Sequence, residues 1–349
     1  MPTAPAMKDI YRRLKPLGFD AAFVRELLLP DWWDDELANV PANRAIAEAT
    51  ISRHLKISVE QLAIAEAALT IPSTVPVRLK SATRGTNAEV VRPSIAIAQR
   101  TATLLVQSLS SELTKFECSP AQNVRQEILA KRGSVTLDSL LEYCWSHGII
   151  IAHLDRLPRV TGFRKFDGLA LFAHDRPVVL LAEKKDAPAW LAFHIAHELG
   201  HLMCRHITPG SALLPDENLE RIINDADENE ADAFANELLT GDPCPNMTAI
   251  YGMTAEKLAE KILRVAPGKQ IDPAVFALVY GHNADRMPVA VKALSLIKQD
   301  IGAKVQIRRY LSQHISTDNL GDTDAHFVET LLMPHHSAEP TAVGQHGDD

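Results

Sequence analysis

The chain has 349 residues, of which 46% are hydrophobic and 23% charged, so it is long enough for two domains with a sizeable core and is not a disordered or fibrous protein. Its formal net charge is −8, so the chain lacks the excess of positive charge that is typical of a nucleic-acid-binding protein. Its four cysteines show no paired spacing, and we find no signal peptide and no apolar run of about eighteen residues. We therefore expect reduced thiols, a cytoplasmic location and no membrane association.

The first 72 residues predict a helical N-terminal domain. Apolar residues recur at helical spacing over residues 9–17, 21–29, 43–55 and 59–69. The run Ala47–Ser58 resembles part of an Xre-type helix-turn-helix domain, but it lacks the glutamine that usually starts the second helix and a basic recognition helix. DNA binding stays open, and a small helical bundle that docks a partner or the rest of the chain is the favoured interpretation.

Residues 73–117 are expected to form a linker and a connecting helix. Between Arg78 and Arg100 the sequence has five basic residues and one acid, Glu89, in a stretch broken by Pro93. Such a stretch either contacts nucleic acid or is a solvated linker.

The next segment predicts a helix followed by a small antiparallel sheet. Residues 137–145 have the spacing of an amphipathic helix, and residues 149–154 form a short strand rich in β-branched residues. Residues 169–172 and 178–181 read as two strands joined by a turn-forming run at 174–177.

The most informative motif is His197-Glu198-Leu199-Gly200-His201, which reads H-E-x-x-H. Residues four apart on a helix lie on one face, about 6 Å apart, so both imidazoles can reach one metal ion. Zinc bound in this way keeps an open coordination position for catalysis, and the carboxylate of Glu198 stands where it can deprotonate an attacking water. The motif therefore predicts amide hydrolysis.

The surroundings of the motif favour a buried helix over a chance match. Asp186 and Ala187 offer an N-cap before Pro188, which is tolerated in a first helical turn. An apolar stripe follows at Leu191, Ile195, Leu199 and Leu202. The alternative is a solvated helix with scattered histidines.

A catalytic zinc site usually needs a third protein ligand. Residues 224–239 predict a second helix, on which Glu228 and Asp232 are four apart and share a face. Glu228 can supply the third ligand while Asp232 accepts the ring N–H of a ligating histidine. Glu230, roughly 200° around the helix from Glu228, is the main alternative ligand, and a merely solvated acidic face is the other alternative.

Together, H-E-L-G-H at 197–201 and E-x-E-A-[ND]-x-F-A-x-x-L-L at 228–239 resemble the ImmA/IrrE family of intracellular zinc metallopeptidases, within the gluzincin class. The likeness covers roughly residues 134–281. Gluzincins carry E-x-x-x-D after the first motif, matched here by Glu228 and Asp232, whereas this family commonly has asparagine in place of Asp232. The family's usual Leu-Leu-Met-Pro ending reads Leu-Leu-Thr-Gly at 238–241, a departure at the helix end.

The resemblance implies an α+β, gluzincin-like peptidase domain over residues 118–285, with Zn²⁺ held by His197, His201 and Glu228 and with Glu198 as the catalytic base. It also implies a protein substrate, such as a helix-turn-helix repressor or an antitoxin. The alternative is a non-catalytic, zinc-containing transcriptional regulator that binds DNA through its N-terminal domain.

Other side chains are expected near this site. His194 is expected beside the ligands as an outer partner, like Asp232, and His206 is expected to cap the end of the motif helix. Tyr251 and Tyr280 are candidates to stabilise an oxyanion, on sequence proximity alone.

The C-terminal part predicts more helices. Helical spacing recurs over residues 254–263, 273–280, 287–300 and 305–312, and residues 286–333 are assigned to a helical extension. From residue 334 the polar sequence predicts a disordered tail.

Overall fold

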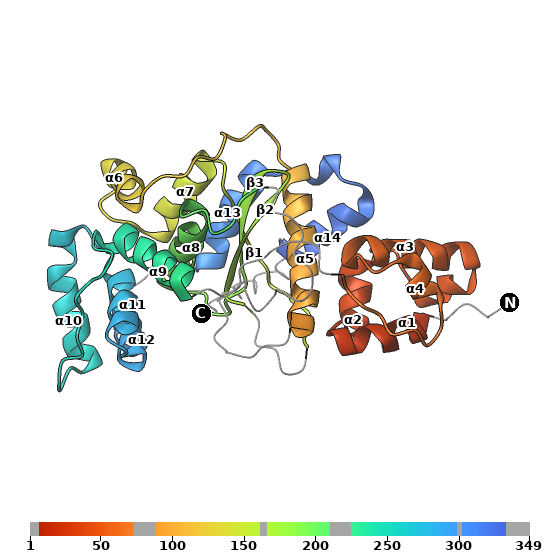
Figure 1. Ribbon diagram of the computed structural model, residues 1–349, viewed down its shortest axis with the longest axis horizontal. Helices are drawn as coiled ribbons and strands as arrows, with labels where there is room; N and C mark the ends of the chain where they lie inside the picture. Colours follow the sequence, from red (N-terminus) through yellow and green to blue (C-terminus); the bar gives the residue numbers. More distant parts are fainter. Residues whose placement is uncertain (1–6, 73–87, 161–165, 210–224, 299–301, 333–349) are drawn as a thin grey trace, which may run out of the picture.

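The computed structural model describes residues 7–72, 88–160, 166–209, 225–298 and 302–332. Over these ranges the chain is an α+β protein, mostly helical around a small sheet (Figure 1). The predicted linker over 73–87 and the predicted tail over 334–349 lie outside the described residues. None of the described helices is both long and apolar enough to span a membrane.

The sheet has three strands in the order β1-β3-β2: β1 (Ile150–His153), β2 (Gly168–Ala173) and β3 (Arg176–Leu181). The predicted hairpin is confirmed, because β2 and β3 pair antiparallel around a turn at His174 and Asp175, both with positive φ. The prediction that the whole sheet is antiparallel is wrong, because β1 pairs parallel with β3. The chain after β1 crosses to the far edge before β2 begins, which leaves β3 between them.

Alternate residues of each strand face two different cores, as the two-residue period of a strand requires. Side chains such as Ile150, Leu169 and Val178 belong to a core shared with the N-terminal helices, α5 (Ala88–Gln107) and α14 (Asp322–Leu332). Their neighbours Ile151, Ala170 and Val179 belong to a second core on the opposite face. The sheet is thus buried on both faces.

The N-terminal helices confirm most of the expected elements. Their bounds are α1 (Met7–Leu14), η1 (Lys15–Leu17), α2 (Ala21–Phe23), η2 (Val24–Leu28), η3 (Asp35–Asn39), α3 (Pro41–Leu55) and α4 (Val59–Ala63). The expected helix over 59–69 ends early, because Ile64 is extended and the buried Arg13 donates to the carbonyls of Leu62 and Ala67 instead. The connecting helix expected before residue 117 is α5, which packs on α3, the sheet and α14.

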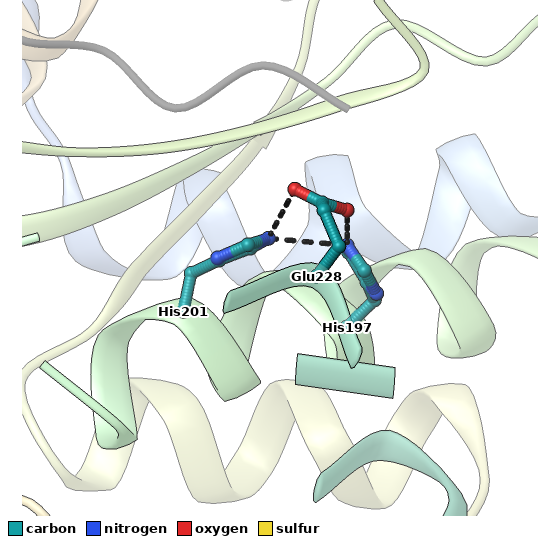
Figure 2. A group of neighbouring side chains, drawn as sticks. All are labelled: His197, His201 and Glu228. Atoms are coloured by element: carbon teal, nitrogen blue, oxygen red, sulfur yellow. Dashed lines mark hydrogen bonds and ion pairs between the residues drawn. The ribbon is translucent and has the colours of Figure 1, made fainter. Parts of the chain in front are cut away.

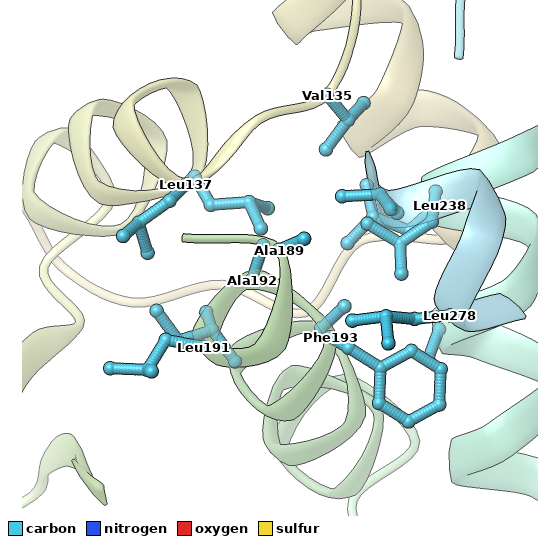
Figure 3. Packing of buried hydrophobic residues seen from close by; sticks show 14 of the residues in the cluster. Val135, Leu137, Ala189, Leu191, Ala192, Phe193, Leu238 and Leu278 are labelled. Carbon is cyan, nitrogen blue, oxygen red and sulfur yellow. The ribbon is translucent and has the colours of Figure 1, made fainter. Parts of the chain in front are cut away.

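The second core lies among the remaining helices (Figure 3). Their bounds are α6 (Ala121–Lys131), α7 (Leu137–Ser146), α8 (Pro188–Met203), α9 (Asp225–Thr240), α10 (Ala255–Val265), η5 (Pro267–Lys269), α11 (Pro273–Asn283), α12 (Met287–Leu296) and α13 (Ala303–His314), and η6 (Thr317–Asn319) precedes α14. Figure 3 shows Leu191 and Phe193 of α8 packed among Leu137, Leu238 and Leu278, which come from α7, α9 and α11. These contacts hold the two helices that carry the predicted site against each other.

A buried arginine binds the C-terminal end of α9. Arg125 of α6 donates from Nη1 to the carbonyls of Leu238 and Leu239 at 3.0 Å each, and from Nη2 to the carbonyls of Lys269 and Gln270. The last carbonyls of a helix have no partner within the helix, so the guanidinium satisfies them in place of water. α9 is thereby fixed at the end opposite to Glu228.

Candidate metal centre

The H-E-x-x-H segment lies on a helix, as predicted, in the C-terminal half of α8. Pro188 is the first residue of α8, and Ala187 is the N-cap. The side chain of Asp186, which we expected to cap the helix, does not do so. Asp186 Oδ1 instead accepts from the backbone N–H of Lys304 at the start of α13, because the chain turns towards that helix. The predicted apolar stripe from Leu191 to Leu202 is buried, and so are the two motif histidines on the other side. α8 is thus buried all round.

A glycine allows α9 to approach the motif closely. A Cβ added at Gly200 would stand 2.7 Å from Ala231 Cα and 2.8 Å from its carbonyl oxygen. Real Cβ atoms do not come this close to backbone atoms, so only glycine fits here. The contact sets Glu228, three residues before Ala231, over the same turn of α8 as the two histidines.

Three side chains meet at the centre (Figure 2). His197 Nε2 and His201 Nε2 are 3.2 Å apart, and each lies 3.4 Å from an oxygen of Glu228. Two ligands of a tetrahedral zinc ion, each about 2.1 Å from the metal, are separated by about 3.4 Å. The triangle therefore has the size of one face of a zinc coordination tetrahedron.

The hydrogen bond made by the outer ring nitrogen of His197, Nδ1, determines the protonation of its inner ring nitrogen, Nε2. His197 Nδ1–H donates to Asp232 Oδ1 at 2.7 Å, which is the partner predicted for it. In the neutral ring Nε2 is then an unprotonated acceptor that points at another imidazole nitrogen and at a carboxylate. Acceptors facing one another repel, and a proton or a metal cation between these atoms relieves that repulsion.

His201 has an outer partner that the sequence did not predict. His206 was expected to cap the helix end, but its Nδ1 lies 3.0 Å from His201 Nδ1, and its Nε2 lies 3.0 Å from Glu230 Oε2. Glu230, the alternative third ligand, is therefore directed at His206 rather than at the centre. With His201 Nδ1–H donating to His206, and His206 Nε2–H donating to Glu230, the inner nitrogen of His201 is also left unprotonated.

Glu228 remains a carboxylate in this half-buried position. Burial by itself raises the pKa of Glu228, but the rings of His197 and His201 reverse that effect and hold the pKa well below its ordinary value. An ionised carboxylate and two imidazoles form a ligand set that suits Zn²⁺, which would take the place of the protons between them.

Glu198 packs against the first residue of β2. It is only 2% exposed, and a Cβ added at Gly168 would stand 2.8 Å from Glu198 Oε1. The missing side chain at Gly168 thus provides the space that the Glu198 carboxylate occupies between α8 and the start of β2.

The remaining predicted residues lie elsewhere. His194 is beside Glu183, with 3.7 Å between Nε2 and Oε2. Tyr251 is fully exposed before α10, and Tyr280 is buried on α11. His282 of α11 lies near the outer partner of His197, with Nε2 3.9 Å from Asp232 Oδ2. No sequence pattern indicates His282, because its position depends on how α11 packs.

No family model, curated protein or solved structure matches this chain. Its function is therefore inferred from the geometry of the centre and from the motifs.

Proposed function

We propose that this chain is a cytoplasmic zinc-dependent endopeptidase of the ImmA/IrrE type that cleaves a protein substrate. The observation that carries the proposal is the triangle of His197 Nε2, His201 Nε2 and the Glu228 carboxylate, with separations of 3.2 to 3.4 Å between acceptor atoms. A divalent cation between these atoms would contact all three of them at once.

His197, His201 and Glu228 would hold the ion. When bound, zinc polarises the scissile carbonyl and lowers the pKa of a coordinated water towards 7. Asp232 and His206 contact the outer nitrogens of the two imidazoles, and these contacts orient the inner nitrogens towards the ion. Binding therefore needs no rearrangement of the described side chains around the centre.

Glu198 would carry the proton. Its carboxylate takes a proton from the attacking water as the new C–O bond forms, and passes it to the leaving amine nitrogen as the C–N bond breaks. The water contributes oxygen to the new carboxyl group, so the reaction is a balanced hydrolysis. Burial of Glu198 against Gly168, which limits the movement of its side chain, supports this role.

The substrate class follows from the family resemblance. We infer that the substrate is a transcriptional repressor, cleaved in a stress response or in a mobile element, or an antitoxin of a toxin–antitoxin pair. Strand β2, an edge strand, begins against Glu198, and an extended peptide is the form of substrate that a strand edge binds through its main chain.

Incubation of the zinc-loaded full chain with repressor proteins encoded beside its gene tests the proposal. We expect cleavage by the wild type and none by Glu198→Gln, which keeps all three ligands and so retains zinc. Zinc bound by both proteins with no cleavage by either, together with specific retention of DNA by the full chain, would favour the non-catalytic regulator instead. The α3–α4 pair does form a helix, turn and helix, but α4 has five residues and none is basic.

A further inference from the structure

A second group of metal-binding side chains lies at one end of the β2–β3 hairpin. Asp167 immediately precedes β2, and Glu183 follows β3 by two residues. The backbone N–H of Ala182 donates to the Asp167 carbonyl at 2.9 Å, which keeps the two strand ends together. α8 brings His194 to the same place. One ligand atom from each of the three side chains lies within 4.8 Å of the other two.

His194 is the unusual member of this group. The residue is only 8% exposed, and within the described ranges its Nε2 is buried without a hydrogen-bond partner. The nearest acceptor, Glu183 Oε2, is 3.7 Å away, too far for a hydrogen bond but close to the spacing of two ligands on one ion. A buried ring nitrogen of this kind costs free energy unless something binds it.

Glu183 is prepared as a ligand from its other oxygen. Its Oε1 accepts from the backbone N–H of Lys185 at 2.9 Å, which leaves Oε2 directed at His194. The Lys185 ammonium itself lies 3.5 Å over the Trp190 ring, so it is engaged there rather than between the two carboxylates.

We propose that Asp167, Glu183 and His194 form a second divalent-metal site, separate from the centre of His197, His201 and Glu228. One imidazole and two carboxylates suit a transition-metal ion such as Zn²⁺ or Mn²⁺. The two negative charges would be neutralised by a divalent cation, and the imidazole nitrogen would gain the partner that it lacks. This site does not depend on the peptidase proposal.

The second site would also position Glu198. Gly168, which follows Asp167, is the residue against which Glu198 packs. An ion that ties Asp167 and Glu183 to α8 would fix the start of β2 on the helix that carries both sites. The ion is thus a structural one that acts on the first centre through the strand.

Zinc binding to the full chain, freed of metal with a chelator, tests the site. Bound zinc per chain is measured by elemental analysis after gel filtration. We expect two equivalents for the wild type, one for Glu183→Gln and one for Glu228→Gln. Asp175→Asn, at the exposed tip of the same hairpin, is the matched control and should keep two. Asp167→Asn repeats the comparison without disturbing the Glu183–His194 pair, in case Glu183→Gln folds poorly.

The outcomes separate this proposal from the first one. The second site is supported if Glu228→Gln binds one equivalent of zinc and the double variant Glu228→Gln/Glu183→Gln binds none. This result would stand even if the first centre proves inactive. In the Glu228→Gln background, zinc should also raise the unfolding midpoint by several degrees, and adding Glu183→Gln should abolish that rise. The proposal would be overturned if the wild type binds only one equivalent of zinc and both Glu183→Gln and Asp167→Asn still bind it. His194 and Glu183 would then form a simple ion pair.

Discussion

His197 and Asp232 lie on different helices, and the His197 Nδ1–H donates to Asp232 Oδ1 at 2.7 Å. Partners of this kind fix the orientation and protonation of a ligating ring, and their loss typically weakens metal binding about 10–100-fold. We predict a loss of this size for Asp232→Ala, measured by competition with a chromophoric zinc chelator. Asp232→Asn should recover most of the affinity, because the amide oxygen can still accept the bond. Equal affinities for Asp232→Ala and the wild type would contradict this role.

His206 should support His201 in the same way. We predict that His206→Leu weakens zinc binding about tenfold, because the outer nitrogen of His201 loses its partner. Glu230→Gln should have a smaller effect, since the Glu230 side chain is 61% exposed and water can replace it. The same chelator competition measures both variants, and an effect of Glu230→Gln larger than that of His206→Leu would argue for Glu230 as a direct ligand.

Gly200→Ala should separate the two helices of the centre. Alanine favours a helix over glycine by about 1 kcal/mol, but overpacking against Ala231 typically costs about 1–3 kcal/mol. We predict a lower free energy of unfolding by denaturant in the metal-free protein and weaker zinc binding, because Glu228 moves with α9. Gly268→Ala is the control, since a Cβ there meets no atom within 4 Å. Unchanged zinc affinity in Gly200→Ala would mean that the close approach does not position Glu228.

Gly168→Ala should lower turnover without lowering metal binding. The atom that a new Cβ would meet is the far end of the Glu198 side chain, which can move at little cost. We predict nearly wild-type stability and zinc content, with a loss of peptidase activity on the order of 10²-fold, because displacement of a catalytic group by about 1 Å has effects of that size. Full activity in this variant, measured on a substrate that the wild type cleaves, would show that Gly168 does not set the position of Glu198.

The N-terminal helices should respond to acid through Asp35. Burial raises the pKa of Asp35, but its bonds with Arg25, Tyr11 and Trp33 reverse the shift and leave the pKa below its ordinary value. A lowered pKa contributes stability above the unfolded value of about 3.9, and this contribution is lost as the pH falls below it. Asp35→Asn should lower the free energy of unfolding by about 1–2 kcal/mol at pH 7 and by less at pH 3. The exposed Asp31→Asn is the control, and an Asp35→Asn effect that does not depend on pH would contradict the assignment.

The sequence predicted those parts of the candidate centre that depend on one helix at a time. The spacing of His197 and His201 and the spacing of Glu228 and Asp232 are properties of single helices, and the structure brings the two pairs together. Glu230 could be judged in the same way, because its angle around the helix already separated it from Glu228.

The rest depends on contacts that no local pattern encodes. His206 reaches His201 only because the chain reverses after α8, where Arg205 adopts a positive φ. The neighbours of His194 come from two strand ends, so its place beside Glu183 could not be read from its position in the motif. The parallel pairing of β1 likewise follows from the path of the chain between strands, which strand propensity does not determine.

A zinc-edge anomalous diffraction map of the crystallised full chain tests the central claim most directly. We predict an ion about 2.0–2.2 Å from His197 Nε2, His201 Nε2 and an oxygen of Glu228. Zinc-soaked crystals with no anomalous peak between these three atoms, or with a peak that Glu228 does not contact, would contradict the account.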